Sequence, residues 1–413
     1  MARKDSTGFN LSEEVRQQAL EQFKSGQPLF GKGGAFAPLL KEILEAALEG
    51  ELAAHLAAEE TDEVEGANRR NGYLSKTIKS SQGSFELRTP RDRRGSFTPE
   101  VVKKRQTILA DSLEDKIIGL YGLGMSYRDI SKHIEDMYDT TISHTVLSEI
   151  TDRIIPKVRE WQNRPLEEVY PIVWLDAMFY KVKDEEGYVV KRCLYNVLGI
   201  RPDGQKEVLG AYISESEGAR FWLEVLNNLQ ARGVKDILIA CIDNLSGFEQ
   251  AITTVFPHTE VQGCIVHQVR NTIKYVTFKD SREIVSDAKR IYRAASKEIA
   301  EENLEAFEQK WSKKYPTVTR SWRNNWSKLS TFFKYPPAVR RVIYTTNAIE
   351  GYHRQLRKVT KTKGVFPSDM GLLKLIYLAT EQIEKKWKRP FREWATTAQQ
   401  LVIIFGDRMK LNI

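Results

Sequence analysis

The sequence predicts an α/β fold with a mixed five-stranded sheet and flanking helices, preceded by a mainly helical region and interrupted by an all-α segment. Three observations support this prediction. A near-continuous apolar run over 170–183 is typical of a strand buried on both faces of a sheet. Strand and helix patterns alternate from Tyr170 onward. Apolar residues recur at helical spacing within 11–60 and again within 111–155.

Length and composition indicate a soluble chain of several domains. The chain has 413 residues, more than one ordinary hydrophobic core can organise. Its composition, 41% hydrophobic and 29% charged residues, is typical of globular proteins. No run approaches the roughly 20 apolar residues that a bilayer span requires, and the polar start lacks a signal-peptide core. Its three cysteines (Cys193, Cys241 and Cys264) are odd in number and far apart, which favours a reducing cytoplasm over a disulfide framework.

Charge is unevenly distributed along the chain. The net charge is +8, yet residues 1–66 carry 13 acids against 6 bases and residues 68–105 carry 11 bases against 3 acids. A segment this basic favours a polyanionic partner, and nucleic acid is the partner that we expect.

The first region, 1–66, is expected to be helical. Leu40, Ile43, Leu44 and Leu48 follow helical spacing, and Gly50 is expected to separate them from a second helical stretch. Acids cover the other face, so the apolar stripe needs a partner helix, either an internal neighbour or a second subunit. We assign 1–66 to N-terminal dimerisation.

The second region, 67–110, is predicted to hold short strands and basic loops. Asn71-Gly72 and Gln82-Gly83 mark turns between strand-forming residues. The acids that would balance a merely solvated face are almost absent, so we expect a DNA-contacting surface. Its predicted contact residues are Arg91, Arg93, Arg94, Lys103, Lys104 and Arg105.

The third region, 111–165, is predicted to contain two short helices joined by a tight polar connection. Ser126, with Asp129 three residues later, predicts a capped helix start, and Ser143 predicts the start of the next helix. The spacing fits a generic helix pair and also a helix-turn-helix. The neighbouring basic surface favours the DNA-binding interpretation.

From Tyr170 the pattern predicts three antiparallel strands, a helix at 217–232 and a fourth strand that lies beside the first. The first strand contains Asp176 and the fourth ends on Asp243. Adjacent placement of these strands would bring the two carboxylates side by side. An ionised Asp within an apolar strand is costly without positive compensation.

A fifth strand is expected to end near Cys264 and His267. A C-x-x-H pair could begin a zinc site, but no second Cys or His pair lies at a usable spacing, so we expect a structural or supporting role. The following residues, 270–340, are predicted to be an all-helical insertion. Its Trp311, Trp322 and Trp326 could stack on unpaired bases, but core packing is the preferred interpretation.

The third candidate acid, Glu350, lies on a helix that begins near Asn347 and is expected to close at Gly364. An ordinary ion pair with a base four residues on would explain this acid. A metal ligand whose helix continues along a phosphate backbone would also explain the bases that share its face. Those bases are Arg354, Arg357, Lys358 and Lys361.

Three converging carboxylates predict a divalent metal site. Mg²⁺ prefers a few carboxylates together with water and substrate oxygens, so Asp176, Asp243 and Glu350 would suffice, and Mn²⁺ is expected to substitute. Such a site supports cleavage and transfer of phosphodiesters.

Several blocks, in order along nearly the whole chain, closely resemble the mutator-type transposases of bacterial insertion sequences. These blocks are NRRNGY, TPRDRRGSF, GMSYRDIS, LDAMFYKV, CIDNLSGF, QGCIVHQVRN and TTNAIEGYHRQLRKVTKTKG. The resemblance implies an RNase H-like catalytic domain, with Asp176, Asp243 and Glu350 as a DDE triad and an all-α insertion between the second and third acids. It also implies that the C-x-x-H element is not a zinc site. Asn244 and His353 depart from the family pattern.

This resemblance further implies a homodimer in the bacterial cytoplasm, associated with the nucleoid when bound to DNA. Such a protein binds terminal inverted repeats and target DNA, and it cuts and joins strands without a covalent enzyme intermediate. The catalytic domain is expected at 166–269 and 341–413, around the insertion. An RNase H-like nuclease or resolvase, and a non-catalytic DNA-binding derivative of a transposase, are the alternatives.

Overall fold

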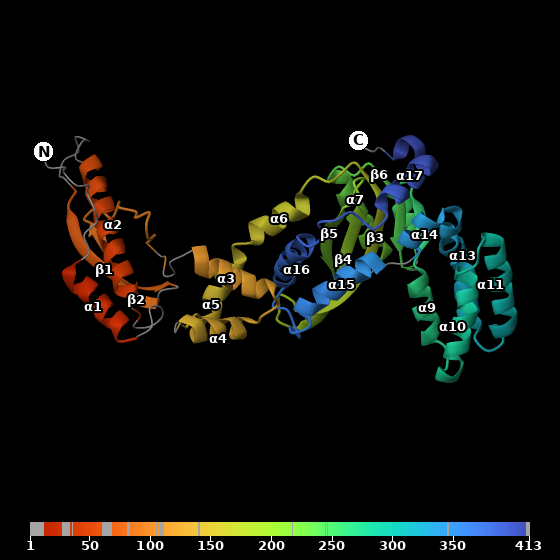
Figure 1. Ribbon diagram of the computed structural model, residues 1–413, viewed down its shortest axis with the longest axis horizontal. Helices are drawn as coiled ribbons and strands as arrows, with labels where there is room; N and C mark the ends of the chain where they lie inside the picture. Colours follow the sequence, from red (N-terminus) through yellow and green to blue (C-terminus); the bar gives the residue numbers. More distant parts are fainter. Residues whose placement is uncertain are drawn as a thin grey trace. The chain divides into compact units, whose positions relative to one another are not determined.

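The structure, a computed structural model, divides into two compact units, 1–153 and 154–413 (Figure 1). It describes residues 12–26, 34, 36–59, 68–80, 83–104, 106, 111–138, 141–216, 218–243, 245, 247–344 and 347–409.

Unit 1 begins with two helices and a β-hairpin. The helices are α1 (Glu13–Lys24) and α2 (Phe36–Glu59), and the antiparallel strands are β1 (Arg70–Ser80) and β2 (Gly83–Asp92). Contrary to the prediction, α2 continues without a break through Gly50. One glycine costs a helix only about 1 kcal/mol, which packing along both neighbouring turns outweighs.

The apolar stripe of α2 is covered within the chain. Leu44 and Leu48 form a small core with Ile78, Leu87 and Val102. The acids of α2 also face the hairpin, because Glu45 accepts a hydrogen bond from the Arg88 amide, Glu49 pairs with Arg70 and Glu51 accepts from the Glu100 and Val101 amides. An internal neighbour therefore covers this stripe.

Asn71-Gly72 does not form the predicted turn. The two residues lie within β1, where the pairing shifts register between Arg70 and Tyr73. Gly72 has a φ of 68°, a conformation typical of a β-bulge that glycine adopts without strain. Ser80 of β1 pairs with Gly83 of β2, and residues 81–82 lie outside the described residues.

Three helices complete unit 1: α3 (Asp111–Gly122), α4 (Tyr127–Tyr138) and α5 (His144–Asp152). The predicted caps are present, because Ser126 and Asp129 exchange side-chain to backbone hydrogen bonds and Ser143 accepts from the Val146 amide at 3.3 Å. Ile130, Ile134, Leu147 and Ile150 are buried, as expected for the inner face of a helix pair. Two helices joined by a short connection are confirmed.

Unit 2 is built on a mixed five-stranded sheet in the order β5-β4-β3-β6-β7. The strands β3, β4 and β5 form the predicted antiparallel meander. β6 adds in parallel beside β3, and β7 adds in parallel beside β6. Their bounds are β3 (Val169–Lys183), β4 (Val189–Ile200), β5 (Lys206–Ser214), β6 (Asp236–Ile242) and β7 (Glu260–Gly263).

Helices cover both faces of this sheet. On one face α7 (Ala219–Ala231) and α8 (Phe248–Val255) pack Trp222 and Phe248 into a core with Val173 and Leu175 of β3. On the other face α15 (Asn347–Thr360) and α16 (Asp369–Glu384) cross in front of the strands in Figure 1. Side chains alternate along a strand, so Asp176, the neighbour of Leu175, faces α15.

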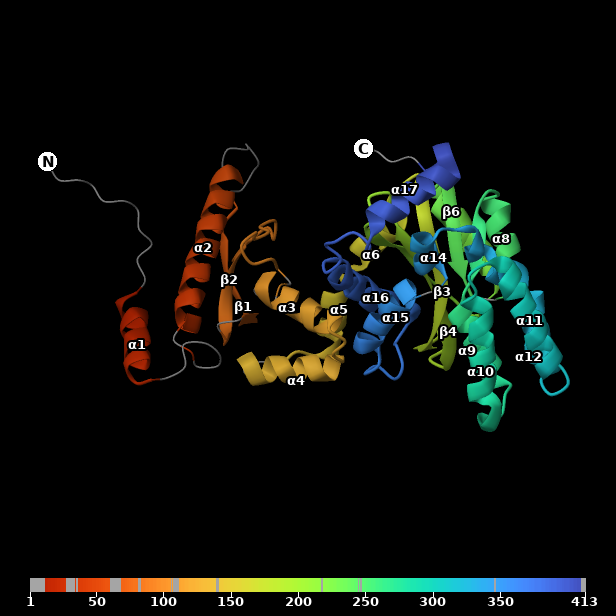
Figure 2. The same cartoon turned by 45° about the vertical axis from the view of Figure 1, so that its right-hand side comes forward.

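A helical region lies at the β7 edge of the sheet (Figure 2). Trp311, Trp322 and Trp326 are buried in it, which confirms core packing. The helices, which account for most of the chain between β7 and α15, are α9 (Ile265–Lys274), α10 (Phe278–Tyr292), α11 (Lys297–Trp311), α12 (Pro316–Asn324), α13 (Trp326–Leu329), η1 (Thr331–Lys334) and α14 (Pro337–Ile343).

Two further features differ from the prediction. α6 (Ile155–Asn163) belongs to unit 2 and packs against α16 and β5, whereas the sequence placed 111–165 in one domain with the helix pair. α15 ends at Thr360, four residues before Gly364. The chain closes with α17 (Trp394–Phe405) and η2 (Gly406–Arg408). In the described part of the chain, every helix is too short or too polar to cross a bilayer.

Candidate active site

Asp176 lies in β3, and Asp243 directly follows β6, the parallel neighbour of β3. Leu175 of β3 is paired with Ile242 of β6, and each carboxylate belongs to the next residue in the chain. The prediction that the fourth strand lies beside the first is therefore confirmed. A mixed sheet with β6 added beside β3 brings together residues that are 67 positions apart in the chain.

The carboxylate of Asp176 is buried, which disfavours its charged form. Asp176 is only 9% exposed, and its Oδ1 accepts a hydrogen bond from the Ala177 amide at 2.8 Å. Burial raises the pKa of Asp176 to about 6; His267 opposes this rise, and the nearby carboxylates of Asp243 and Glu350 add to it. Burial raises the pKa of Asp243 as well. The charges of Asp243 and Glu350 thus both act on Asp176.

His267 supplies positive charge to these acids. Burial alone lowers the pKa of His267, but the Cys264 thiol and the carboxylates of Asp176 and Asp243 outweigh this and raise it to about 9. Cys264 caps α9 by accepting from the His267 amide at 3.5 Å. The C-x-x-H element therefore places one imidazolium beside the acids.

Glu350, in the first turn of α15, is held by Arg270 of α9. The guanidinium donates from Nη1 to Oε1 at 2.6 Å and from Nη2 to Oε2 at 3.2 Å. The same Oε1 lies 4.0 Å from His267 Nε2. Both oxygens of Glu350 are thus engaged by a base, while its charge still acts on Asp176.

The donor set suits a hard cation. Carboxylate oxygens are the ligands that Mg²⁺ prefers, and two of the three acids have raised pKa values, which an added cation would relieve. Among the described residues, however, no three His, Cys, Asp or Glu side chains are spaced to hold a metal ion in this arrangement. Glu350 would have to leave Arg270 before it could join the two aspartates.

His353 of α15 lies between Asp176 of β3 and Asn196 of β4. Its Nδ1 lies 3.4 Å from Asp176 Oδ2, and its Nε2 lies 3.1 Å from Asn196 Nδ2 of β4. Burial lowers the pKa of His353 to about 3, so its ring is neutral. An amide nitrogen only donates, so Nε2 accepts and Nδ1 carries the proton toward Asp176. The interaction fixes the orientation of the buried carboxylate.

The predicted DNA-contact residues fall into two exposed sets. Arg91, Arg93, Arg94, Lys103 and Lys104 are exposed in unit 1, and Arg105 lies outside the described residues. Arg354, Arg357, Lys358 and Lys361 are exposed in or just after α15 in unit 2. Asn347 is the first residue of α15, while Thr345, Thr346 and Asn244 also lie outside the described residues.

Sequence reasoning missed two residues of this site. Arg270 is three residues after His267 and His353 is three residues after Glu350, so each shares a helical face with a predicted site residue. This three-residue spacing is the feature of the sequence that could have identified Arg270 and His353 as site residues. Which acid Arg270 would bind depends on how α9 and α15 pack, and the sequence does not contain that information.

Nearly the whole chain matches a known protein family and several known proteins. Residues 12–390 match the family model described as "Transposase, Mutator family". A probable transposase for an ISRM3-like insertion sequence element of Sinorhizobium fredii is 43% identical over 398 residues, which is 95% of this chain and 99% of that protein. The transposase for insertion sequence element ISRM3 of Rhizobium meliloti is 43% identical over 400 residues, with the same coverage.

A more distant relative and a solved structure also match. A probable insertion sequence transposase of Corynebacterium diphtheriae is 40% identical over 339 residues, covering 77% of this chain and 98% of that protein. Among solved structures, a chain of the Drosophila P element transposase strand transfer complex matches at a TM-score of 0.28 and 11% identity, covering 69% of this chain and 81% of that chain. A TM-score this low carries no argument about the fold.

Proposed function

The chain belongs to the Mutator family of transposases, and from this premise we propose that it binds the terminal inverted repeats of its insertion sequence and catalyses metal-dependent DNA cleavage and strand transfer. The observation that carries the proposal is the pair Asp176 and Asp243 at adjacent strands, with Glu350 close enough to raise the Asp176 pKa.

The sheet supports an RNase H-like assignment for the catalytic domain. Three antiparallel strands are followed by a parallel strand beside the first and a second parallel strand beyond it, and helices cover both faces. The helices from α9 to α14 lie between the second and third acids, as an all-α insertion would. We accordingly assign Asp176, Asp243 and Glu350 as the DDE triad.

In the proposed mechanism, Asp176, Asp243 and Glu350 would hold Mg²⁺, or Mn²⁺ in its place. Such ions activate water or a 3′-hydroxyl and stabilise the leaving oxygen of a phosphodiester. Asn196 and His353 keep Asp176 oriented. Arg270 holds both carboxylate oxygens of Glu350 until the carboxylate is needed.

DNA would contact basic surfaces on each unit. In unit 2 the bases of α15 begin four residues after Glu350, so a phosphate backbone along this helix would pass the acids. In unit 1 the exposed bases that follow β2 and the helix pair α4 and α5 are the proposed site-recognition surfaces. We propose a homodimer, since the two ends of an element need two copies of such surfaces.

The proposal is tested by incubating the purified chain with Mg²⁺ and duplexes that carry the inverted repeats flanking its gene. A transposase cuts at the repeat boundary and joins the freed 3′ end to a second DNA. Cutting without any joining would indicate a nuclease or resolvase. Tight binding without cutting under Mg²⁺ or Mn²⁺ would indicate a non-catalytic derivative. Random-sequence duplexes serve as the control.

A further inference from the structure

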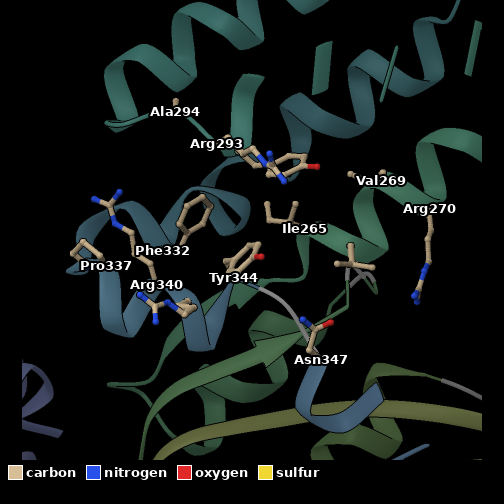
Figure 3. Close-up of a pocket in the computed structure, with 13 residues that line it drawn as sticks. Ile265, Val269, Arg270, Arg293, Ala294, Phe332, Pro337, Arg340, Tyr344 and Asn347 are labelled. Atoms are coloured by element: carbon tan, nitrogen blue, oxygen red, sulfur yellow. The ribbon is translucent and has the colours of Figure 1, made fainter. Parts of the chain in front are cut away.

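Beside the acids lies a pocket that the mechanism above does not use. It has a volume of about 780 Å³ and is bounded by α9, the end of α10, η1, α14 and the start of α15 (Figure 3). Two of its lining residues reach the site: Arg270 binds Glu350, and Asn347 lies one turn before Glu350 on α15. A molecule in this pocket would therefore lie next to the proposed cleavage position.

One wall of the pocket is aromatic. The rings of Phe332 and Tyr344 have centroids 6.4 Å apart with an interplanar angle of 52°. Figure 3 shows these rings gathered with Ile265 around the hollow. Tyr292 also lines the pocket, and its pKa is raised by burial, with a contribution from the nearby Tyr344. Flat aromatic and apolar walls are what a nucleobase stacks on.

Arginines are the charged residues of the pocket lining. Its described lining contains four arginines and neither Asp nor Glu. Three of the four already have partners: Arg270 binds Glu350, Arg341 binds Glu393 at 2.7 Å, and Arg340 donates to the carbonyl oxygen of Phe333 at 2.7 Å.

Arg293 differs from these three. It is exposed, and within the described part of the chain it makes no ion pair with a carboxylate. Figure 3 places it across the hollow from Asn347. A guanidinium in that position is suited to bind a phosphate whose base enters the aromatic part.

From this geometry we propose that the pocket binds one unpaired nucleotide of the DNA substrate, next to the cleavage position, with its base against Tyr344 and Phe332 and its phosphate on Arg293. The inference rests on the proposed function, because it takes DNA as the substrate. The volume lies within the roughly 300–1,000 Å³ range of small-molecule sites, too small for a duplex. The nucleotide must therefore leave its base pair, which costs free energy. Stacking and the phosphate contact offset that cost.

Photo-crosslinking tests this assignment directly. The wild-type chain is bound, in EDTA, to inverted-repeat duplexes that carry 5-iodouracil at single positions around the boundary. We expect one position to crosslink, and mass spectrometry to locate the adduct on Tyr344, Tyr292 or Phe332. Tyr344→Leu should reduce the yield roughly tenfold, because base stacking on one aromatic ring contributes about that factor or more. Adducts outside the pocket, or an unchanged yield in Tyr344→Leu, would overturn the assignment.

A second measurement uses an exposed residue, whose replacement leaves the fold intact. Arg293→Gln should slow cleavage of paired DNA several-fold, while DNA with a mismatch at the crosslinked nucleotide is cut at nearly the wild-type rate, because its base is already unpaired. Arg282→Gln, an equal loss of charge at an exposed position of α10 outside the pocket lining, should slow neither substrate. Equal slowing of both substrates by Arg293→Gln would contradict the proposal.

The two proposals fail in different ways. If the wild-type chain neither binds nor cuts inverted-repeat DNA, the proposed function fails. If it binds and cuts, yet no boundary nucleotide crosslinks to the pocket, the pocket assignment alone fails.

Discussion

Arg270 of α9 binds both carboxylate oxygens of Glu350 of α15, at 2.6 and 3.2 Å. A bidentate guanidinium pair is the strongest common ion-pair geometry. It also occupies the oxygens that a metal ion would need. Arg270 therefore competes with a divalent cation for the third acid of the proposed triad.

Removing this competition should tighten metal binding. Arg270→Gln is expected to lower the Kd for Mn²⁺ in the absence of DNA by about two- to fivefold, since Arg270 is 55% exposed and such ion pairs contribute up to about 1 kcal/mol. Electron paramagnetic resonance of free Mn²⁺ measures this. The matched control is Arg354→Gln, an exposed arginine on the same helix as Glu350. Equal or weaker Mn²⁺ binding by Arg270→Gln would show that the ion pair does not oppose the metal.

We expect the neutral His353 to affect the cleavage rate because it orients the carboxylate of Asp176. His353→Leu removes the donor to Asp176 and is expected to slow cleavage about 10- to 100-fold with DNA affinity unchanged, the usual effect of losing a group that orients a metal ligand. His353→Gln keeps one donor and one acceptor and should recover much of the rate. If Gln and Leu are equally slow, His353 contributes packing and not orientation.

Much of the fold was predictable because it follows from local patterns. The run around Asp176 predicts a buried strand, and the meander that follows predicts its neighbours, so the adjacency of β3 and β6 followed from the order of elements. The caps at Ser126 and Ser143 depend only on residues three positions away. The errors at Gly50 and Asn71-Gly72 have a common cause, since tertiary packing decides whether a glycine ends an element or is accommodated within it.

The site was predictable only in part. Each acid lies in or beside a strand or helix with a clear pattern, so its element was recognisable. Contacts between α9 and α15, which pair Arg270 with Glu350, join residues 80 positions apart and leave no periodic signal in the sequence. The pocket lined by Tyr344 and Phe332 is likewise formed by several short helices, whose packing no local pattern specifies.

Asp92 gives unit 1 a stability that depends on pH. Burial alone raises the pKa of Asp92, but hydrogen bonds from Asn68, from the Ser96 side chain and from the Ser96 and Phe97 amides outweigh it and hold the pKa well below its ordinary value. The ionised form is thus stabilised on folding. This contribution is fully present above the unfolded pKa of about 3.9 and is lost progressively as the pH falls from there through the lower pKa of the folded state.

Asp92→Asn should therefore destabilise unit 1 by roughly 2–3 kcal/mol at pH 7, the range for hydrogen bonds to a buried charge. Urea unfolding followed by far-ultraviolet circular dichroism should show that the difference from wild type shrinks at pH 3. Glu100→Gln, at an exposed position nearby, is the control and should have little effect at either pH. A difference that persists undiminished at pH 3 would mean that shape, and not charge, explains the loss.

The basic face of α15 is expected to contact phosphates. Lys358→Glu should weaken inverted-repeat binding and reduce the slope of log K against log salt by about 1, the value for one lost phosphate contact. Fluorescence anisotropy at several salt concentrations measures both quantities. Lys313→Glu makes the same charge change at an exposed position between α11 and α12. An unchanged slope in Lys358→Glu would remove this helix from the proposed DNA path.

The central claim is that Asp176 is part of a metal-dependent centre that cuts and joins DNA. Asp176→Asn keeps the size of the side chain and removes its charge, and Asp407→Asn makes the same change at an exposed position far along the chain. With Mg²⁺ and labelled inverted-repeat duplexes, the account predicts that Asp176→Asn binds DNA with wild-type affinity but yields neither cleaved nor joined product, while Asp407→Asn yields both. Cleavage by Asp176→Asn at the wild-type rate would contradict it.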